Sequence, residues 1–140
     1  MARVVIIGGG PGGYEAASAA AQLGAEVTVV DSDGIGGSGV LTDAVPSKTL
    51  IATAEVMTEV AEAGELGVRV KGDGVSGIAD PANSVRVDLS VVNQRVKRLA
   101  AAQSDGITRR LDRDKVRIIQ ARGRLDGPET VIAGDERLDA

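Results

Sequence analysis

The feature that most constrains the fold is the stretch RVVIIGGGPGG at residues 3–13, a β-branched run followed at once by clustered glycines. Residues 3–7 show no polar alternation, which predicts a buried strand of a parallel sheet. An alanine-rich segment follows and ends at Gly24, which predicts a helix with a glycine stop. A second β-branched run at residues 25–31 predicts another strand. Strand, turn, helix and strand make a right-handed βαβ unit, which places the chain in the α/β class.

The glycines have the spacing Gly8-x-Gly10-x-x-Gly13, which is typical of a dinucleotide-binding turn. Gly8 permits a tight turn, Gly10 lets the backbone approach a pyrophosphate, and Gly13 lets the helix pack against the sheet. The first helical turn offers N–H groups and the positive end of its dipole to phosphates. Asp31 ends the second predicted strand, where a carboxylate accepts hydrogen bonds from a ribose. The alternatives are an unrelated ligand on a glycine-rich turn and a merely polar strand end at Asp31.

Missing residue types exclude several kinds of chemistry. The chain has no cysteine and no histidine, which excludes a thiolate nucleophile, an imidazole base, and cysteine or histidine ligands to a metal. We assign no catalytic residue and no metal site. Its net charge of −4 and its single aromatic residue, Tyr14, disfavour nucleic acid as a partner. We expect no membrane span, because no run of about 18 apolar residues occurs. The apolar N-terminal stretch is too short for a signal peptide, which favours a cytoplasmic location.

The remaining sequence predicts two more helices and further strands. The first helix runs from Pro46 to about Ala63, with the proline in its first turn. Asp88 caps the second helix, which extends to Asp112. Between these helices we expect a loop with a short strand at residues 68–70. Other predicted features are a strand and bend at residues 116–125, a hairpin turning at Gly134–Asp135, and a helix face of Val92, Val96, Leu99, Ile107 and Leu111.

Three segments together carry a resemblance to a known family: GGGPGGYEAA from Gly8, VVD ending at Asp31, and GIGGSGVLTDAVPSK at residues 34–48. They resemble the N-terminal FAD domain of the pyridine nucleotide–disulfide oxidoreductase family, and the likeness covers essentially the whole chain. The resemblance implies a Rossmann-like FAD-binding domain with a parallel sheet and a small antiparallel β-meander. It also implies that residues 1–140 are the N-terminal domain of a longer homodimeric protein, without its NAD(P)-binding and dimerisation domains.

The family's paired cysteines are missing from residues 34–48, a segment that we interpret as a glycine-rich loop running into a helix. The resemblance places the two cysteine positions at Gly39 and Ala44, and a threonine position at Ser38. Without a dithiol, no mixed disulfide with a substrate forms. By the same resemblance, Lys48 lies near the flavin N5 edge, where a cation stabilises negative charge on the reduced flavin.

The resemblance also implies a set of cofactor contacts in which glycine backbone predominates. At Gly123, a backbone contact with adenine and a strand bend that needs glycine are equal alternatives, whereas Arg122 is expected to be solvated. The expected FAD-binding residues are Gly8, Gly10, Pro11, Gly12, Gly13, Asp31, Ser32, Gly36, Gly37, Ser38, Lys48 and Gly123.

The implied activity is electron transfer from NAD(P)H through FAD directly to a small-molecule acceptor of the quinone or dye type, as in the cysteine-lacking members that the chain resembles. The small residues Gly39 and Ala44 leave the flavin face open to a planar acceptor. The alternatives are a non-catalytic FAD- or nucleotide-binding module, an inactive fragment of a dihydrolipoamide dehydrogenase, and half of an NAD-dependent dehydrogenase. The Val-Pro-Ser-Lys sequence ending at Lys48 argues against the last, because a simple NAD domain has no use for it.

Overall fold

The computed structural model describes residues 1–71 and 78–140, and the chain divides into two compact units. The first unit combines residues 1–46 with residues 98–140, and the second comprises residues 47–97. None of the described helices is both long and apolar enough to cross a membrane. The helices are α1 (Pro11–Gln22), α2 (Gly37–Leu41), α3 (Ala44–Glu62), α4 (Pro81–Ser84) and α5 (Leu89–Arg113). The strands are β1 (Arg3–Ile7), β2 (Glu26–Asp31), β3 (Val70–Lys71), β4 (Ile78–Ala79), β5 (Arg117–Gln120), β6 (Gly123–Leu125), β7 (Thr130–Ala133) and β8 (Glu136–Asp139).

A three-stranded parallel sheet in the order β1-β2-β5 lies at the centre of the first unit. The register pairs Ile7 with Val30 and Asp31 with Gln120, so the carboxyl ends of the three strands share one edge. The β1–α1–β2 segment is therefore the predicted βαβ unit, and the predicted α/β class is confirmed. Gly24, with φ of 87°, follows the end of α1 as the predicted glycine stop.

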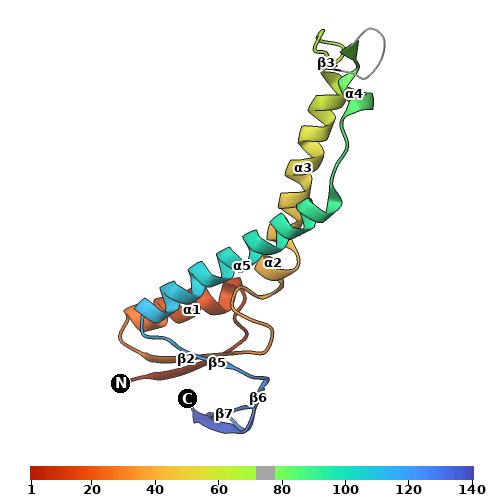
Figure 1. The fold of residues 1–140 in the computed structure, drawn as a ribbon. Helices are drawn as coiled ribbons and strands as arrows, with labels where there is room; N and C mark the ends of the chain where they lie inside the picture. The colour runs from red at the N-terminus through yellow and green to blue at the C-terminus, as the bar shows by residue number, and fades with distance from the viewer. Residues whose placement is uncertain (72–77) are drawn as a thin grey trace. The chain divides into compact units, whose positions relative to one another are not determined.

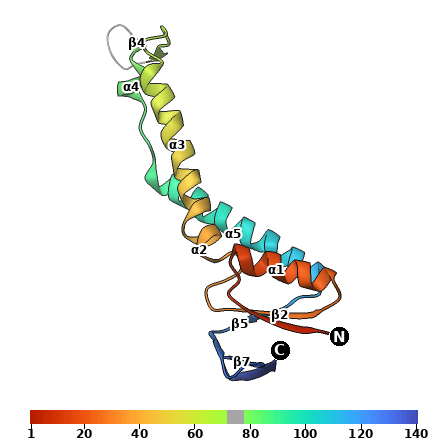
Figure 2. The same cartoon turned by 180° about the vertical axis from the view of Figure 1, so that it is seen from behind.

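Helices cover one face of this sheet, and a β-meander formed by β6, β7 and β8 covers the other (Figure 1, and from behind in Figure 2). On one face Val29 belongs to the same buried cluster as Ala17 of α1 and Leu111 of α5. On the other face Val30 clusters with Val131 of the β-meander. Because neighbouring residues of a strand point to opposite faces, the central strand β2 is buried on both sides by aliphatic side chains.

The β-meander consists of β6, β7 and β8, which pair antiparallel in that order. Its last hairpin turns at Gly134, whose φ of 61° suits glycine. The predicted antiparallel meander and the predicted hairpin at Gly134–Asp135 are both confirmed.

Two predictions of burial in the first unit are wrong. In the part of the chain that the structure describes, β1 pairs with β2 alone, so it is an edge strand and Ile7 is 44% exposed. On α5, Leu99 is 38% exposed, and Ala100 is buried in its place. Val96, Ile107 and Leu111 are buried as predicted.

The segment at residues 34–48 is more helical than we predicted. A short helix, α2, begins at Gly37, and α3 begins at Ala44, two residues before the predicted start. Pro46 still lies in the first turn of α3, where its missing N–H removes no intrahelical hydrogen bond. Val40 is buried in the same cluster as Val29, and this tertiary contact explains a helix that the local glycine-rich sequence does not favour.

The second unit contains short elements where we predicted mainly loop. β3 and β4 pair antiparallel, and the short strand predicted at residues 68–70 overlaps β3 at Val70. The side chain of Asp80 caps α4, which we did not predict. The Asp88 carboxylate accepts hydrogen bonds from the backbone of Ser90 and Val91, which confirms it as the cap of α5. The loop prediction for residues 72–77 lies outside the described residues.

Candidate functional site

The first glycine loop, as we call residues 8–13, comprises the turn after the carboxyl end of β1 and the first three residues of α1. Gly8 has φ of 105° and donates its N–H to the Val30 carbonyl over 2.8 Å, which permits the tight turn. A Cβ added to Gly13 would lie 1.9 Å from the Gly8 carbonyl oxygen, far inside van der Waals contact. The first and last glycines of the spacing therefore have the structural roles that the sequence predicted.

The second glycine loop, as we call residues 34–39, includes the first three residues of α2 and packs against the first loop backbone to backbone. The Gly36 N–H donates to the Gly9 carbonyl over 2.8 Å. A Cβ added to Gly37 would lie 2.8 Å from the Gly10 Cα atom, so the backbones of the two loops lie too close together for a side chain at Gly37. Gly36 itself has φ of 111°. The structure thus brings together the two segments that the sequence proposed for one ligand.

Asp31 ends β2 and joins the two loops. One carboxylate oxygen accepts the Gly9 N–H over 2.6 Å, and the other accepts the N–H groups of Asp33 and Gly34 over 2.8 and 2.7 Å. A carboxylate offers about four lone-pair sites, so these three donors leave room for one more. Its predicted contact with a ribose hydroxyl stays a prediction, and holding the loops is a role that the sequence did not reveal.

The geometry at the start of α1 fits a phosphate group. Within the described residues no side chain caps α1, because its N-cap is Gly10. A Cβ added to Gly10 or Gly12 would meet no described atom within 4 Å, so the surface beside the first turn is open. Main-chain N–H groups and the positive dipole end there favour an anion. A dinucleotide pyrophosphate has the charge and the oxygen acceptors that this surface suits.

The other predicted contacts are placed less directly. Ser32 and Ser38 are exposed residues of the segment that follows β2. Lys48 is an exposed residue of α3 in the second unit, and its predicted role beside a flavin stays a prediction. A Cβ added to Gly123 would lie 3.1 Å from Ile7 and 3.2 Å from Val30, so close packing explains this glycine without a ligand. Its contact with adenine therefore stays one of two alternatives.

Three residues of the site were missed by the sequence analysis. Gly9 occupies an unspecified position of the glycine spacing, yet it provides a donor to Asp31 and an acceptor to Gly36. The unbroken run of three glycines was the available signal. Ile35 is a buried residue of the second loop, and its carbonyl accepts a hydrogen bond from the hydroxyl of Ser104 on α5. No local pattern marks Ser104, which lies 69 residues further along the chain.

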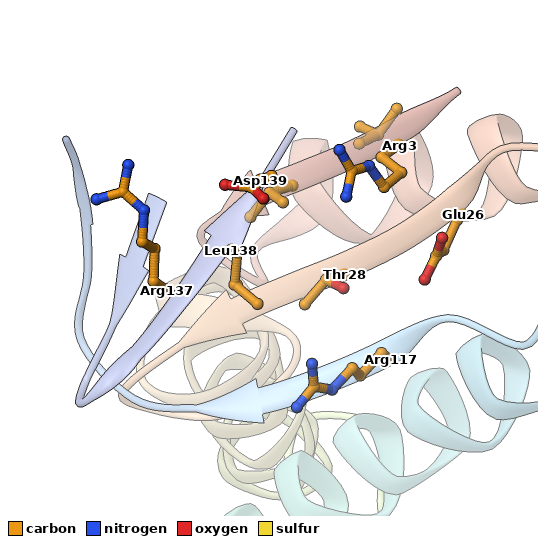
Figure 3. A pocket seen from close by; sticks show the side chains of 9 residues that line it. Arg3, Glu26, Thr28, Arg117, Arg137, Leu138 and Asp139 are labelled. Carbon is orange, nitrogen blue, oxygen red and sulfur yellow. The ribbon is translucent and has the colours of Figure 1, made fainter. Parts of the chain in front are cut away.

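A separate cavity of about 220 Å³ lies at the opposite end of the parallel strands (Figure 3). Its lining includes Arg3, Glu26 and Arg117, the first residues of β1, β2 and β5. Arg117 donates to both carboxylate oxygens of Glu136, and these hydrogen bonds raise the pKa of the guanidinium. Because ligands of open parallel sheets bind at the carboxyl ends of the strands, this cavity is not the candidate site.

The contact between the loops predicts that alanine at Gly37 lowers the stability of the fold strongly, whereas alanine at Gly39 changes it little. We expect Gly37→Ala to lower the free energy of unfolding by about 2 kcal/mol, because Gly37 has φ of 58° and its new Cβ would meet Gly10. Gly39→Ala is the control, since its Cβ would lie 3.6 Å from Pro11, an ordinary contact. Urea unfolding followed by circular dichroism compares the two, and equal midpoints would contradict the packing of the loops.

A glycine turn, an acidic strand end and a second glycine loop at the carboxyl edge of a parallel sheet define a dinucleotide-binding domain. Residues 2–140 match the family model described as pyridine nucleotide-disulphide oxidoreductase. The chain belongs to this family, which confirms the resemblance inferred from its sequence.

Curated relatives include two kinds of enzyme. An NAD(P)H dehydrogenase (quinone) from Mycobacterium tuberculosis is 45% identical over 128 residues, which cover 89% of this chain and 24% of that protein. A dihydrolipoyl dehydrogenase from Bacillus subtilis is 34% identical over 125 residues, which cover 89% of this chain and 24% of that protein. The chain thus spans about a quarter of the length of these relatives.

Solved structures agree with the family. The crystal structure of LpdA from Mycobacterium tuberculosis matches with a TM-score of 0.77 and 39% identity, over 100% of this chain and 30% of that one. A second match is the HOCl-induced flavoprotein disulfide reductase RclA from Escherichia coli, with a TM-score of 0.71. It is 16% identical and covers 96% of this chain and 25% of that one, so it supports the fold alone.

Proposed function

We propose that this chain is the FAD-binding part of a flavin-dependent NAD(P)H oxidoreductase that passes electrons directly to a quinone-like or dye-like acceptor, without a redox disulfide. Membership of the family supports FAD as the cofactor and NAD(P)H as the co-substrate. The similarity to a protein named NAD(P)H dehydrogenase (quinone) supports the acceptor class. In this proposal the whole protein works as a cytoplasmic homodimer.

The observation that carries the proposal is a frame of two glycine loops that is intact while both sulfurs are missing. Gly39 and Ala44 occupy the positions where the resemblance places the cysteines, and the whole sequence contains no cysteine. A disulfide relay needs a thiolate that attacks the substrate disulfide, so this chain has no such route. When bound, FAD supplies the capacity to take a hydride from NAD(P)H and to release electrons to another acceptor.

The chain's own residues bind and orient the cofactor in this proposal. The two glycine loops provide main-chain donors to the pyrophosphate. Asp31 holds both loops and accepts a hydrogen bond from a ribose hydroxyl. Lys48 provides a positive charge for the reduced flavin. Gly39 and Ala44 carry no side chain beyond a methyl group, so they leave space for a planar acceptor beside the flavin.

The activity test uses the protein encoded by the longest reading frame that contains this chain. We expect a yellow protein that oxidises NADH or NADPH with a quinone at least about 100-fold faster than with lipoamide, because no dithiol is present. Stopped-flow absorbance of the flavin follows both steps. Lipoamide reduction at a comparable rate would refute the proposed route. Bound FAD that NAD(P)H does not reduce would support a non-catalytic FAD-binding module instead.

A further inference from the structure

The peptide group between Ile35 and Gly36 is held at both of its ends. Its carbonyl accepts a hydrogen bond from the Ser104 hydroxyl of α5. Its N–H donates to the Gly9 carbonyl over 2.8 Å. Two hydrogen bonds of opposite sense fix the orientation of a peptide plane, whereas one alone would leave it free to rotate about its flanking bonds.

This peptide group links α5 to both glycine loops. Gly9, which accepts the Gly36 N–H, donates its own N–H to Asp31 over 2.6 Å. Asp31 in turn accepts the Gly34 N–H. The contacts therefore run without interruption from α5 through the second loop to the first loop and the end of β2. All of these residues belong to the first unit.

Serine at position 104 of α5 is less favourable for the helix than alanine unless its hydroxyl makes a useful hydrogen bond. Residues 100–102 of α5 are alanines, and alanine would favour the helix more than serine does at position 104. A serine within a helix commonly bonds to a carbonyl one turn earlier, but this hydroxyl bonds to a residue 69 positions away. Without it, the partly buried Ile35 carbonyl would lose a donor, which is unfavourable.

We infer that Ser104 is a positioning residue for the cofactor, because it sets the orientation of the second glycine loop against the first one. The inference rests on the proposed function, since the phosphate-binding backbone is what the orientation serves. The Gly36 N–H is donated to Gly9, and the Gly37 N–H is donated to the Gly34 carbonyl over 3.2 Å, so both are used within the loops. The plane that Ser104 fixes therefore acts on the N–H groups that follow in the first turn of α2, because it sets the direction in which that helix begins. Ser104 acts through Ile35 and does not itself touch the dinucleotide.

The first measurement is FAD affinity, by quenching of flavin fluorescence with the 140-residue chain. We expect Ser104→Ala to bind FAD about tenfold more weakly, the effect of one hydrogen bond, and Ser104→Thr to stay within about threefold of the unmodified chain. The matched control is Ser90→Ala on the same helix, whose hydroxyl is exposed and accepts from Gln94 over 3.5 Å. Unchanged affinity in Ser104→Ala would overturn the inference while leaving the proposed function in place.

The second measurement needs no cofactor, so it tests the positioning role of Ser104 separately from the proposed FAD-binding function. Amide hydrogen exchange of the ¹⁵N-labelled chain reports the hydrogen bond from Gly36 to Gly9. We expect Ser104→Ala to speed exchange at Gly36 about tenfold, while Ser104→Thr and Ser90→Ala leave it unchanged. Equal exchange in all variants would overturn the inference. If the unmodified chain binds no FAD, the proposed function fails, and exchange at Gly36 still decides whether Ser104 orients the loop.

Discussion

Replacing Gly13 by alanine is expected to lower the free energy of unfolding by about 3 kcal/mol and to prevent the first glycine loop from forming. The new Cβ would lie 1.9 Å from the Gly8 carbonyl oxygen and 3.0 Å from its carbon. Both are backbone atoms of the turn that leaves β1, so no side chain can rotate away to make room. The first turn of α1 would have to move off the strand, at an energy typical of severe overpacking.

Gly12→Ala is the matched control for Gly13→Ala. It adds the same methyl group in the same turn of α1, yet its Cβ would meet no described atom within 4 Å. Because alanine favours a helix over glycine, this variant should be as stable as the unmodified chain, or more stable by up to about 1 kcal/mol. Urea unfolding monitored by circular dichroism measures both. Similar losses in the two variants would show that helix-end flexibility, not the contact with Gly8, determines the need for glycine.

The sequence predicts the βαβ unit closely because its determinants are local. β-branched residues define β1 with the predicted bounds, and Gly8 and Gly24 mark the turn after β1 and the end of α1 through backbone conformations that glycine adopts most easily. The hairpin of β7 and β8 was predictable for the same reason, since Gly134 marks its turn directly. Each of these features depends on neighbours within a few residues.

The features that the sequence did not reveal depend on residues far apart. Burial of β1 was predicted from its composition, but exposure depends on which strands lie beside it. α2 forms where Val40 reaches the core, although four residues from Gly36 to Gly39 include three glycines. Ser104 meets the loop only once α5 packs on the sheet. A pattern within one segment contains no information about such partners.

Asp31 shows both sides of this limit. Its position at the end of β2 was predictable from the sequence, whereas its three backbone donors were not. The reason is that two of these donors, Gly9 and Gly34, belong to different loops that meet only in the folded chain. Sequence spacing therefore predicted a carboxylate that faces a ligand, and the structure adds that the same carboxylate holds the loops together.

Asp31→Asn is therefore expected to lower the free energy of unfolding by about 2–3 kcal/mol and to weaken FAD binding by more than about tenfold. Both oxygens of Asp31 accept main-chain N–H groups, from Gly9 on one side and from Asp33 and Gly34 on the other. An asparagine has a single acceptor oxygen, so either orientation of its amide points an NH₂ group at a backbone donor. Rotating the side chain only exchanges one repulsive contact for the other.

Asp33→Asn is the control that isolates this effect. This variant also removes one negative charge, but from an exposed side chain two residues further along the chain. It keeps the backbone N–H of Asp33, which donates to Asp31. We expect its free energy of unfolding to stay within about 0.5 kcal/mol of the unmodified chain, as for an ordinary surface substitution. Urea unfolding and FAD titration of both variants supply the comparison. If the two variants lost equal stability, the general loss of negative charge would account for the effect, and the Asp31 carboxylate would not be what joins the loops.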